Sequence, residues 1–204
     1  RGGDAVTVSL GELDVAALVE SCRGATVRGL LPISAAGYVG TGAEGQALTP
    51  LQRTIEADAL RYSNVTVEID RAKRVATYTV KAPTKAVEAD IAAIEAAGAN
   101  WYPLALAREL EDAILSMRTN ELDIGTWLIK TQGDAAAVLQ MDEVLQKHAK
   151  HWLVRETIGL LRRTLSRLDV SSRSLFALIE PGSCFAGTFL ELALACDRSY
   201  MLAL

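Results

Sequence analysis

The residues best suited to chemistry in this 204-residue chain lie between positions 179 and 197. An apolar segment ends at Pro181-Gly182, small residues follow, and a helix is expected to begin near Gly187-Thr188. This order of strand, tight turn and helix gathers backbone N–H groups around a small space that can hold an anion or an oxyanion. Glu191 follows in an otherwise apolar helix, where burial would raise the pKa of its carboxyl group and suit it to acid–base catalysis. The pattern leaves open the alternative that Glu191 is exposed to solvent and stabilises the helix N-terminus.

Two neighbours of this turn carry reactive or charged groups. Cys184 could act as a nucleophile or an acid, because a helix N-terminus lowers the pKa of a nearby thiol. A small buried cysteine is the commoner outcome and is favoured. Glu180 is charged at the end of an apolar strand, so it needs a partner, and an arginine could supply one.

Two other patterns suggest chemistry that their context does not support. Residues 40–45 fit the string G-x-G-x-x-G, but QALTPLQR follows in place of an apolar helix, which indicates a flexible loop. His148 and His151 have the spacing that would place two metal ligands on one face of a helix. No third ligand of matching type is evident, and Lys147 and Lys150 would oppose a cation, so a solvated helix face and no metal are expected.

Composition limits the classes of function. The chain has 21 Lys and Arg against 25 Asp and Glu, a formal net charge of −4, and 50% hydrophobic residues. This balance argues against a nucleic-acid partner or an anionic membrane surface, because both need clustered excess Lys and Arg. The sequence has no apolar run of about 18 residues, the length that would predict a membrane span. Three scattered cysteines favour a reducing, cytoplasmic compartment over a disulfide framework.

Hydrophobic periodicity predicts an α/β chain that can position the turn. Residues 64–70 and 74–80 alternate apolar and polar side chains, which predicts a β-hairpin. Apolar residues at steps of three and four predict a helix that begins near 102–103. The other predicted elements are a strand at 124–130, a long helix in the region 142–169, a strand at 174–180 and a helix at 186–196. A helix–strand order with short connections is typical of an α/β layer.

The first fifty residues differ from the rest, because they are rich in Gly, Ala and Ser and have only short apolar runs. Residues 13–19 predict a short helix, and residues 35–50 predict a loop or linker. We therefore divide the chain into residues 1–58, an N-terminal segment and linker with no clear assignment, and residues 59–204, which form one module.

The segment around Glu191, EPGSCFAGTFLELALACDRSY, resembles the signature of the crotonase (enoyl-CoA hydratase/isomerase) superfamily. In that superfamily an apolar strand leads into a Gly-rich turn, and a helix with a Glu-Leu-Ala pair follows and ends at Cys-Asp. The preceding elements occur in the matching order, from a hairpin that ends in KAP to the strand IGTWLIK. The resemblance implies a crotonase-like α/β fold, a spiral of ββα units, here as a partial module truncated at its C-terminal end.

Longer runs, such as NELDIGTW and HWLVRETIGLLRRTLSRLDVSSRSLFALIEPGSCFAGTF, resemble one group within this superfamily most closely. Its members are carbon–carbon lyases that open the ring of a dihydrodiol of benzoyl-CoA and release formate in aerobic benzoate degradation. The match is to their second crotonase-like half and does not include residues 1–48. It implies an acyl-CoA thioester substrate, a homo-oligomer, and no metal or redox cofactor, since CoA is part of the substrate.

The resemblance also implies roles for single residues. Crotonases hold the thioester oxygen with two backbone N–H groups while an enolate forms. One of these groups would come from Gly187 or Thr188, and the other, by a loose match, from a loop near Leu139. Glu191 matches the Glu of the Glu-Leu-Ala pair and would act as the acid or base.

Departures from the family pattern leave the role of this module open. The turn has Gly187-Thr188-Phe189 where the family usually has three glycines, and Phe189 would crowd the approach of a thioester. The second carboxylate that active hydratases carry further along the chain has no match. Three hypotheses remain: a catalytic module with Glu191, a non-catalytic scaffold half of the same lyase, and a generic enoyl-CoA hydratase or isomerase.

Overall fold

The computed structural model describes residues 45–202, and the residues from Gln46 onward form one compact unit. The helix predicted at 13–19 lies outside the described residues, as does the loop predicted from 35 onward up to residue 44. The division proposed after residue 58 stays a prediction.

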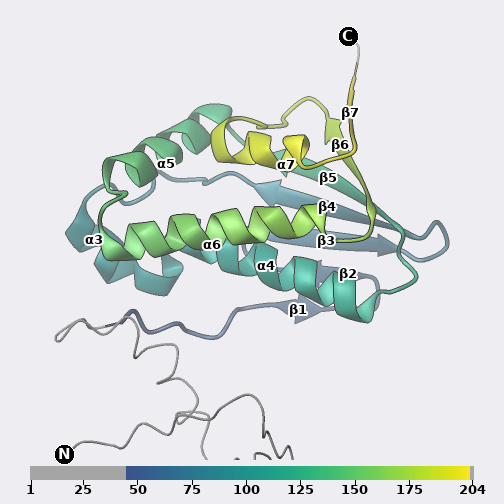
Figure 1. The fold of residues 1–204 in the computed structure, drawn as a ribbon, viewed down its shortest axis with the longest axis horizontal. Helices are drawn as coiled ribbons and strands as arrows, with labels where there is room; N and C mark the ends of the chain where they lie inside the picture. The colour runs from purple at the N-terminus through teal and green to yellow at the C-terminus, as the bar shows by residue number, and fades with distance from the viewer. Residues whose placement is uncertain (1–44, 203–204) are drawn as a thin grey trace, which may run out of the picture. The chain divides into compact units, whose positions relative to one another are not determined.

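Seven strands form one sheet, in which their order is their order along the chain (Figure 1). Strands β1 to β4 pair antiparallel, and β4 to β7 pair parallel. Parallel neighbours need crossover connections, and helices supply each of them. The strands are β1 (Thr54–Ile55), β2 (Ala59–Arg61), β3 (Val65–Asp70), β4 (Val75–Lys81), β5 (Thr126–Gln132), β6 (Ser174–Ile179) and β7 (Arg198–Met201).

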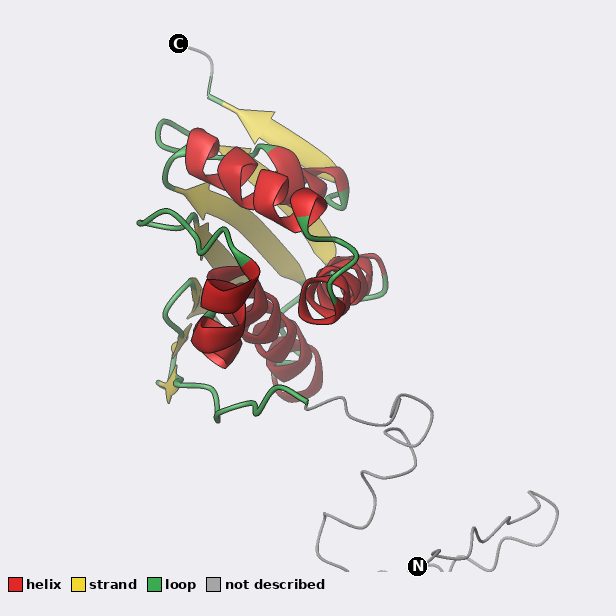
Figure 2. Ribbon diagram, turned by 90° about the vertical axis from the view of Figure 1, so that its left-hand side faces the viewer, coloured by secondary structure: helices red, strands yellow, loops and turns green. Residues whose placement is uncertain are grey.

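The connecting helices lie in front of the sheet in Figure 1, and Figure 2 shows the same elements after a 90° turn. Between β4 and β5 lie α3 (Ile91–Ala97), the 3₁₀ turn η2 (Gly98–Asn100) and α4 (Tyr102–Asn120); between β5 and β6 lie α5 (Ala135–Lys147) and α6 (Trp152–Asp169); between β6 and β7 lie the 3₁₀ turn η3 (Gly187–Phe189) and α7 (Leu190–Leu194). In the described part of the chain, no helix has both the length and the apolar character needed to cross a membrane.

The core lies between the helices and one face of the sheet. Ala76, Tyr78 and Val80 of β4 are buried, whereas the residues between them are only half-buried. Trp127 and Ile129 continue the buried row on β5, and the ring centroids of Tyr78 and Trp127 lie 5.0 Å apart. Side chains along these strands point alternately to the two faces of the sheet, so every second residue lies on the face that the helices cover.

The predicted α/β class and the order of its main elements are confirmed. The hairpin predicted at 64–70 and 74–80 is β3–β4, paired antiparallel. The helix predicted near 102 is α4, and the strands predicted at 124–130 and 174–180 correspond to β5 and β6.

The prediction of one long helix in the region 142–169 is wrong. Helix α5 ends at Lys147, a turn follows, and α6 begins at Trp152. Buried apolar residues continue on both sides of the break, with Leu145 before it and Leu153 after it, so periodicity alone does not reveal it.

The helix predicted at 186–196 is also shorter than expected, because it begins as the 3₁₀ turn η3 and α7 ends at Leu194. Strands β1, β2 and β7 and helix α3 were not predicted. They have two to seven residues each, too few to show a clear period.

Candidate functional site

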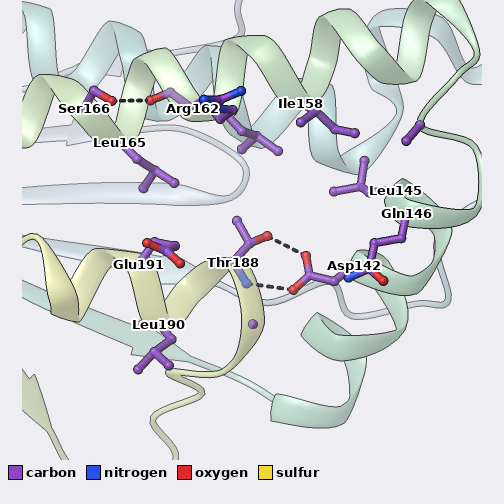
Figure 3. Close-up of a pocket in the computed structure, with 13 residues that line it drawn as sticks. Asp142, Leu145, Gln146, Ile158, Arg162, Leu165, Ser166, Thr188, Leu190 and Glu191 are labelled. Atoms are coloured by element: carbon purple, nitrogen blue, oxygen red, sulfur yellow. Dashed lines mark hydrogen bonds between the residues drawn. The ribbon is translucent and has the colours of Figure 1, made fainter.

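A hollow of about 810 Å³ lies between α5, α6 and the turn that leads into α7 (Figure 3). Its apolar lining comes from Leu145, Ala149, Ile158, Leu161, Leu165 and Leu190, and its polar lining from Asp142, Gln146, Arg162, Ser166, Thr188 and Glu191, with Gly187 beside them. Ligand sites commonly have a volume of about 300–1,000 Å³ and a similar mixture of groups. Three predicted site residues, Gly187, Thr188 and Glu191, are therefore brought together in one hollow.

The backbone N–H of Thr188, a predicted oxyanion donor, already has an acceptor. It donates a hydrogen bond to Oδ2 of Asp142 at 2.7 Å, and the Thr188 hydroxyl donates to Oδ1 of the same carboxylate at 2.5 Å (Figure 3). Asp142 lies on α5, so these bonds join that helix to η3. The carboxylate occupies the position on this amide that the resemblance assigns to a thioester oxygen.

Gly187 is the residue that lets Asp142 come so close. Its φ is +47°, in the left-handed region that favours glycine. A Cβ added at this position would lie 1.9 Å from Oδ2 of Asp142. Any other residue here would push the carboxylate off Thr188.

The prediction that Phe189 crowds the site is wrong. Phe189 is 1% exposed, belongs to the hydrophobic core and does not line the hollow. An aromatic side chain buries a large apolar area, so this residue anchors the turn from beneath.

Glu191 is exposed and lies across the hollow from Arg162 (Figure 3). No hydrogen bond or ion pair links its side chain to another described residue. The expectation that Glu191 is buried is therefore wrong. The alternative left open by the sequence, an exposed carboxylate in the first turn of α7, is the observed state.

The expected loop near Leu139 is wrong, because this residue lies inside α5 and its side chain is exposed. Only the first four N–H groups of a helix lack an intrahelical acceptor. The amide of Leu139 comes after them, since Val138 already bonds to the carbonyl of Asp134. The N–H of Leu139, which the resemblance assigns to the oxyanion, therefore forms a hydrogen bond within the helix.

Cys184 and Glu180 lie outside this hollow. Cys184 is 1% exposed, and burial raises the pKa of its thiol, which agrees with the buried cysteine favoured from the sequence and not with a nucleophile. Its backbone N–H donates to Oγ1 of Thr131. Glu180 has a partner, as expected, but the partner is Lys130 at 2.9 Å and not an arginine.

The two histidines do not share a site. His148 follows the last residue of α5, and its Nε2 lies 2.9 Å from the carbonyl oxygen of Ala89. His151 precedes α6 and lies 3.2 Å from Glu95. Residues 45–202 contain no group of three or more His, Cys, Asp or Glu side chains placed to hold a metal ion.

Two residues of the hollow, Asp142 and Arg162, were missed from the sequence. Asp142 begins the helical pattern at 142–169 and Arg162 lies off its apolar stripe, so the pattern marks neither for chemistry. Contacts between residues 46 positions apart, such as Asp142 and Thr188, leave no spacing signal in a single sequence.

The chain is similar to a named relative over most of its length. It is 56% identical over 161 residues to a benzoyl-CoA-dihydrodiol lyase from Aromatoleum evansii, which covers 79% of this chain. The resemblance seen in the sequence is thereby confirmed. The chain spans only 29% of the length of that relative.

The other comparisons add less. A crystal structure of an enoyl-CoA hydratase from Geobacillus kaustophilus aligns with 74% of this chain and 48% of its own, with a TM-score of 0.43 and 16% identity. No protein-family model matches the chain.

Proposed function

We propose that this chain is a segment of a benzoyl-CoA-dihydrodiol lyase, an enzyme that acts on a CoA thioester. The proposal is carried by the 56% identity over 161 residues with a protein of that name. The reaction would open the ring of a dihydrodiol of benzoyl-CoA by carbon–carbon lysis and release formate. The protein that contains the chain would be a cytoplasmic homo-oligomer, and CoA would enter as part of the substrate.

Within this lyase, we propose that the described segment is a supporting module. Two observations favour this role over a catalytic one. The Thr188 amide is bonded to Asp142, and Glu191 is exposed to solvent with no partner among the described residues. A catalytic oxyanion site needs donors that are free and aimed at the reacting oxygen.

The competing proposal keeps Glu191 as the acid or base and the turn as the oxyanion site. It is favoured by the fact that Gly187, Thr188 and Glu191 line one hollow of about 810 Å³. In this case Asp142 would have to leave Thr188 before a thioester oxygen could bind there.

The reaction is tested by assaying formate release from the dihydrodiol of benzoyl-CoA with the protein that contains this chain. We expect formate, and no hydration of crotonyl-CoA. Hydration without formate would instead support the generic hydratase or isomerase and contradict the lyase.

The role of the segment is tested by calorimetric titration of the 204-residue chain with benzoyl-CoA, with free CoA as the control. A supporting module predicts no heat that depends on the benzoyl thioester. Micromolar binding that requires the thioester, by a chain shown to be folded, would favour the catalytic proposal.

A further inference from the structure

We propose that Asp142 keeps a thioester oxygen from binding at the turn Gly187–Phe189, because its carboxylate already accepts the hydrogen bonds of Thr188. This inference rests on the proposed function, because a thioester oxygen matters only if the substrate is an acyl-CoA. It assigns a task to a residue that neither the sequence pattern nor the resemblance singled out.

The first support is that the contact between Asp142 and Thr188 uses both oxygens of the carboxylate. Each oxygen of Asp142 receives one hydrogen bond from Thr188, at 2.7 Å from the backbone N–H and at 2.5 Å from the hydroxyl. Hydrogen bonds to an ionised acceptor are roughly twice as strong as those between neutral groups. A neutral thioester oxygen would have to displace a stronger acceptor from the same N–H.

The second support is that the departures of this turn from the family pattern fit the contact. The residue after Gly187 carries a hydroxyl, and that hydroxyl makes the second bond to Asp142. The carboxylate of Asp142 lies so close to Gly187 that a Cβ at this position would clash with it. Phe189 is buried in the core. Thr188 and Phe189 are therefore placed to hold the turn closed.

The third support is the charge around the contact. Glu191 of α7 and Arg162 of α6 line the same hollow, so Asp142 and Glu191 present two carboxylates against a single arginine. A thioester oxygen gains negative charge as an enolate forms. Neighbouring carboxylates oppose that charge, which is the reverse of what oxyanion stabilisation requires.

The test is solvent exchange of the backbone amides at pH 7 in the isotopically labelled 204-residue chain, followed in NMR spectra. We expect the Thr188 amide to be protected from exchange and its proton to resonate downfield, because a carboxylate accepts its hydrogen bond. Asp142→Asn should speed solvent exchange of the Thr188 amide about tenfold, as expected for the loss of one charged acceptor. Glu143→Gln, a change at the exposed neighbour of Asp142, should leave the exchange unchanged.

Benzoyl-CoA is then added to the wild-type chain at pH 7, with CoA as the control. We expect the Thr188 amide signal to stay in place. A shift of this signal that needs the thioester would overturn the closure, and so would a Thr188 amide that exchanges with solvent as fast as an unprotected one. The exchange measurement needs no ligand and uses the wild-type chain, so it tests the closure even where Asp142→Asn does not fold. An inactive parent protein would contradict the proposed lyase and leave the amide exchange untouched.

Discussion

Glu109 and Asp142 each accept a hydrogen bond from a backbone N–H group of a distant segment, and they do so in different surroundings. Glu109 of α4 accepts the Asn64 N–H at 2.7 Å and the Asn64 side-chain amide at 3.2 Å, and it is only 5% exposed. Asp142 of α5 accepts two bonds from Thr188, but it is half-buried and lines the hollow. Both carboxylates accept two hydrogen bonds from one residue, but Glu109 is more deeply buried than Asp142.

The difference separates stability from function. Glu109 fixes the segment before β3 against α4, and because it is only 5% exposed, an unpaired polar group there would be costly. Asp142 fixes a turn that borders open space, where water can replace a lost partner. We therefore expect changes at Glu109 to act mainly on folding, and changes at Asp142 to act mainly on what the hollow admits.

The largest expected effect is at Glu109. Glu109→Ala removes the acceptor for two Asn64 donors in a nearly buried place, so it should lower the free energy of unfolding by about 3 kcal/mol. Denaturant unfolding measures this change. Glu143→Ala, on an exposed helix face, should change it by less than about 0.5 kcal/mol. Equal losses of unfolding free energy in Glu109→Ala and Glu143→Ala would contradict a special role of Glu109 in stability.

A smaller effect is expected at Asp142. Asp142→Ala leaves the Thr188 N–H at the edge of the hollow, so unfolding should become easier by about 1–2 kcal/mol. The same denaturant series measures it. A loss as large as that at Glu109 would mean that the turn at Gly187 is as buried as the start of β3, which would contradict the difference in burial between the two sites.

The smallest effect is a pH dependence at Glu109. Burial raises the pKa of its carboxyl group above the ordinary value of 4.5, and the bonds from Asn64 oppose this shift only partly. The folded state therefore holds this proton more tightly than the unfolded state does. The contribution of Glu109 to stability should be fully present below about pH 4.5 and be lost as the pH rises through the raised pKa.

Comparing the unfolding free energies of the wild type and Glu109→Gln between pH 4 and 7 isolates this term. The wild type should lose stability relative to the variant as the pH rises. The opposite slope would mean that the bonds from Asn64 outweigh the burial.

Much of the fold could be predicted because its signals are local. The alternation in β3 and β4 and the apolar steps in α4 each lie within one element. The break between α5 and α6 could not be predicted, because it contains no glycine or proline. Its histidines contact Ala89 and Glu95, in a segment far back along the chain.

The site divides in the same way. Gly187, Thr188 and Glu191 were found because a strand, a turn and a helix follow one another in sequence. Asp142 was not found, since its partner is 46 residues away and helix α5 was not predicted with its true bounds. Glu191 is exposed because the side of α7 that packs against the core carries Leu192 and Ala193. The sequence of this five-residue helix does not show which side packs.

The central proposal, that this chain belongs to a lyase whose chemistry does not use this hollow, is tested most directly by one turnover measurement. Formate release from the dihydrodiol of benzoyl-CoA is compared between the wild-type protein that contains this chain and its Glu191→Gln variant. We expect both proteins to release formate at the same rate. A loss of about a hundredfold or more in the variant, the size expected for a catalytic acid or base, would contradict it.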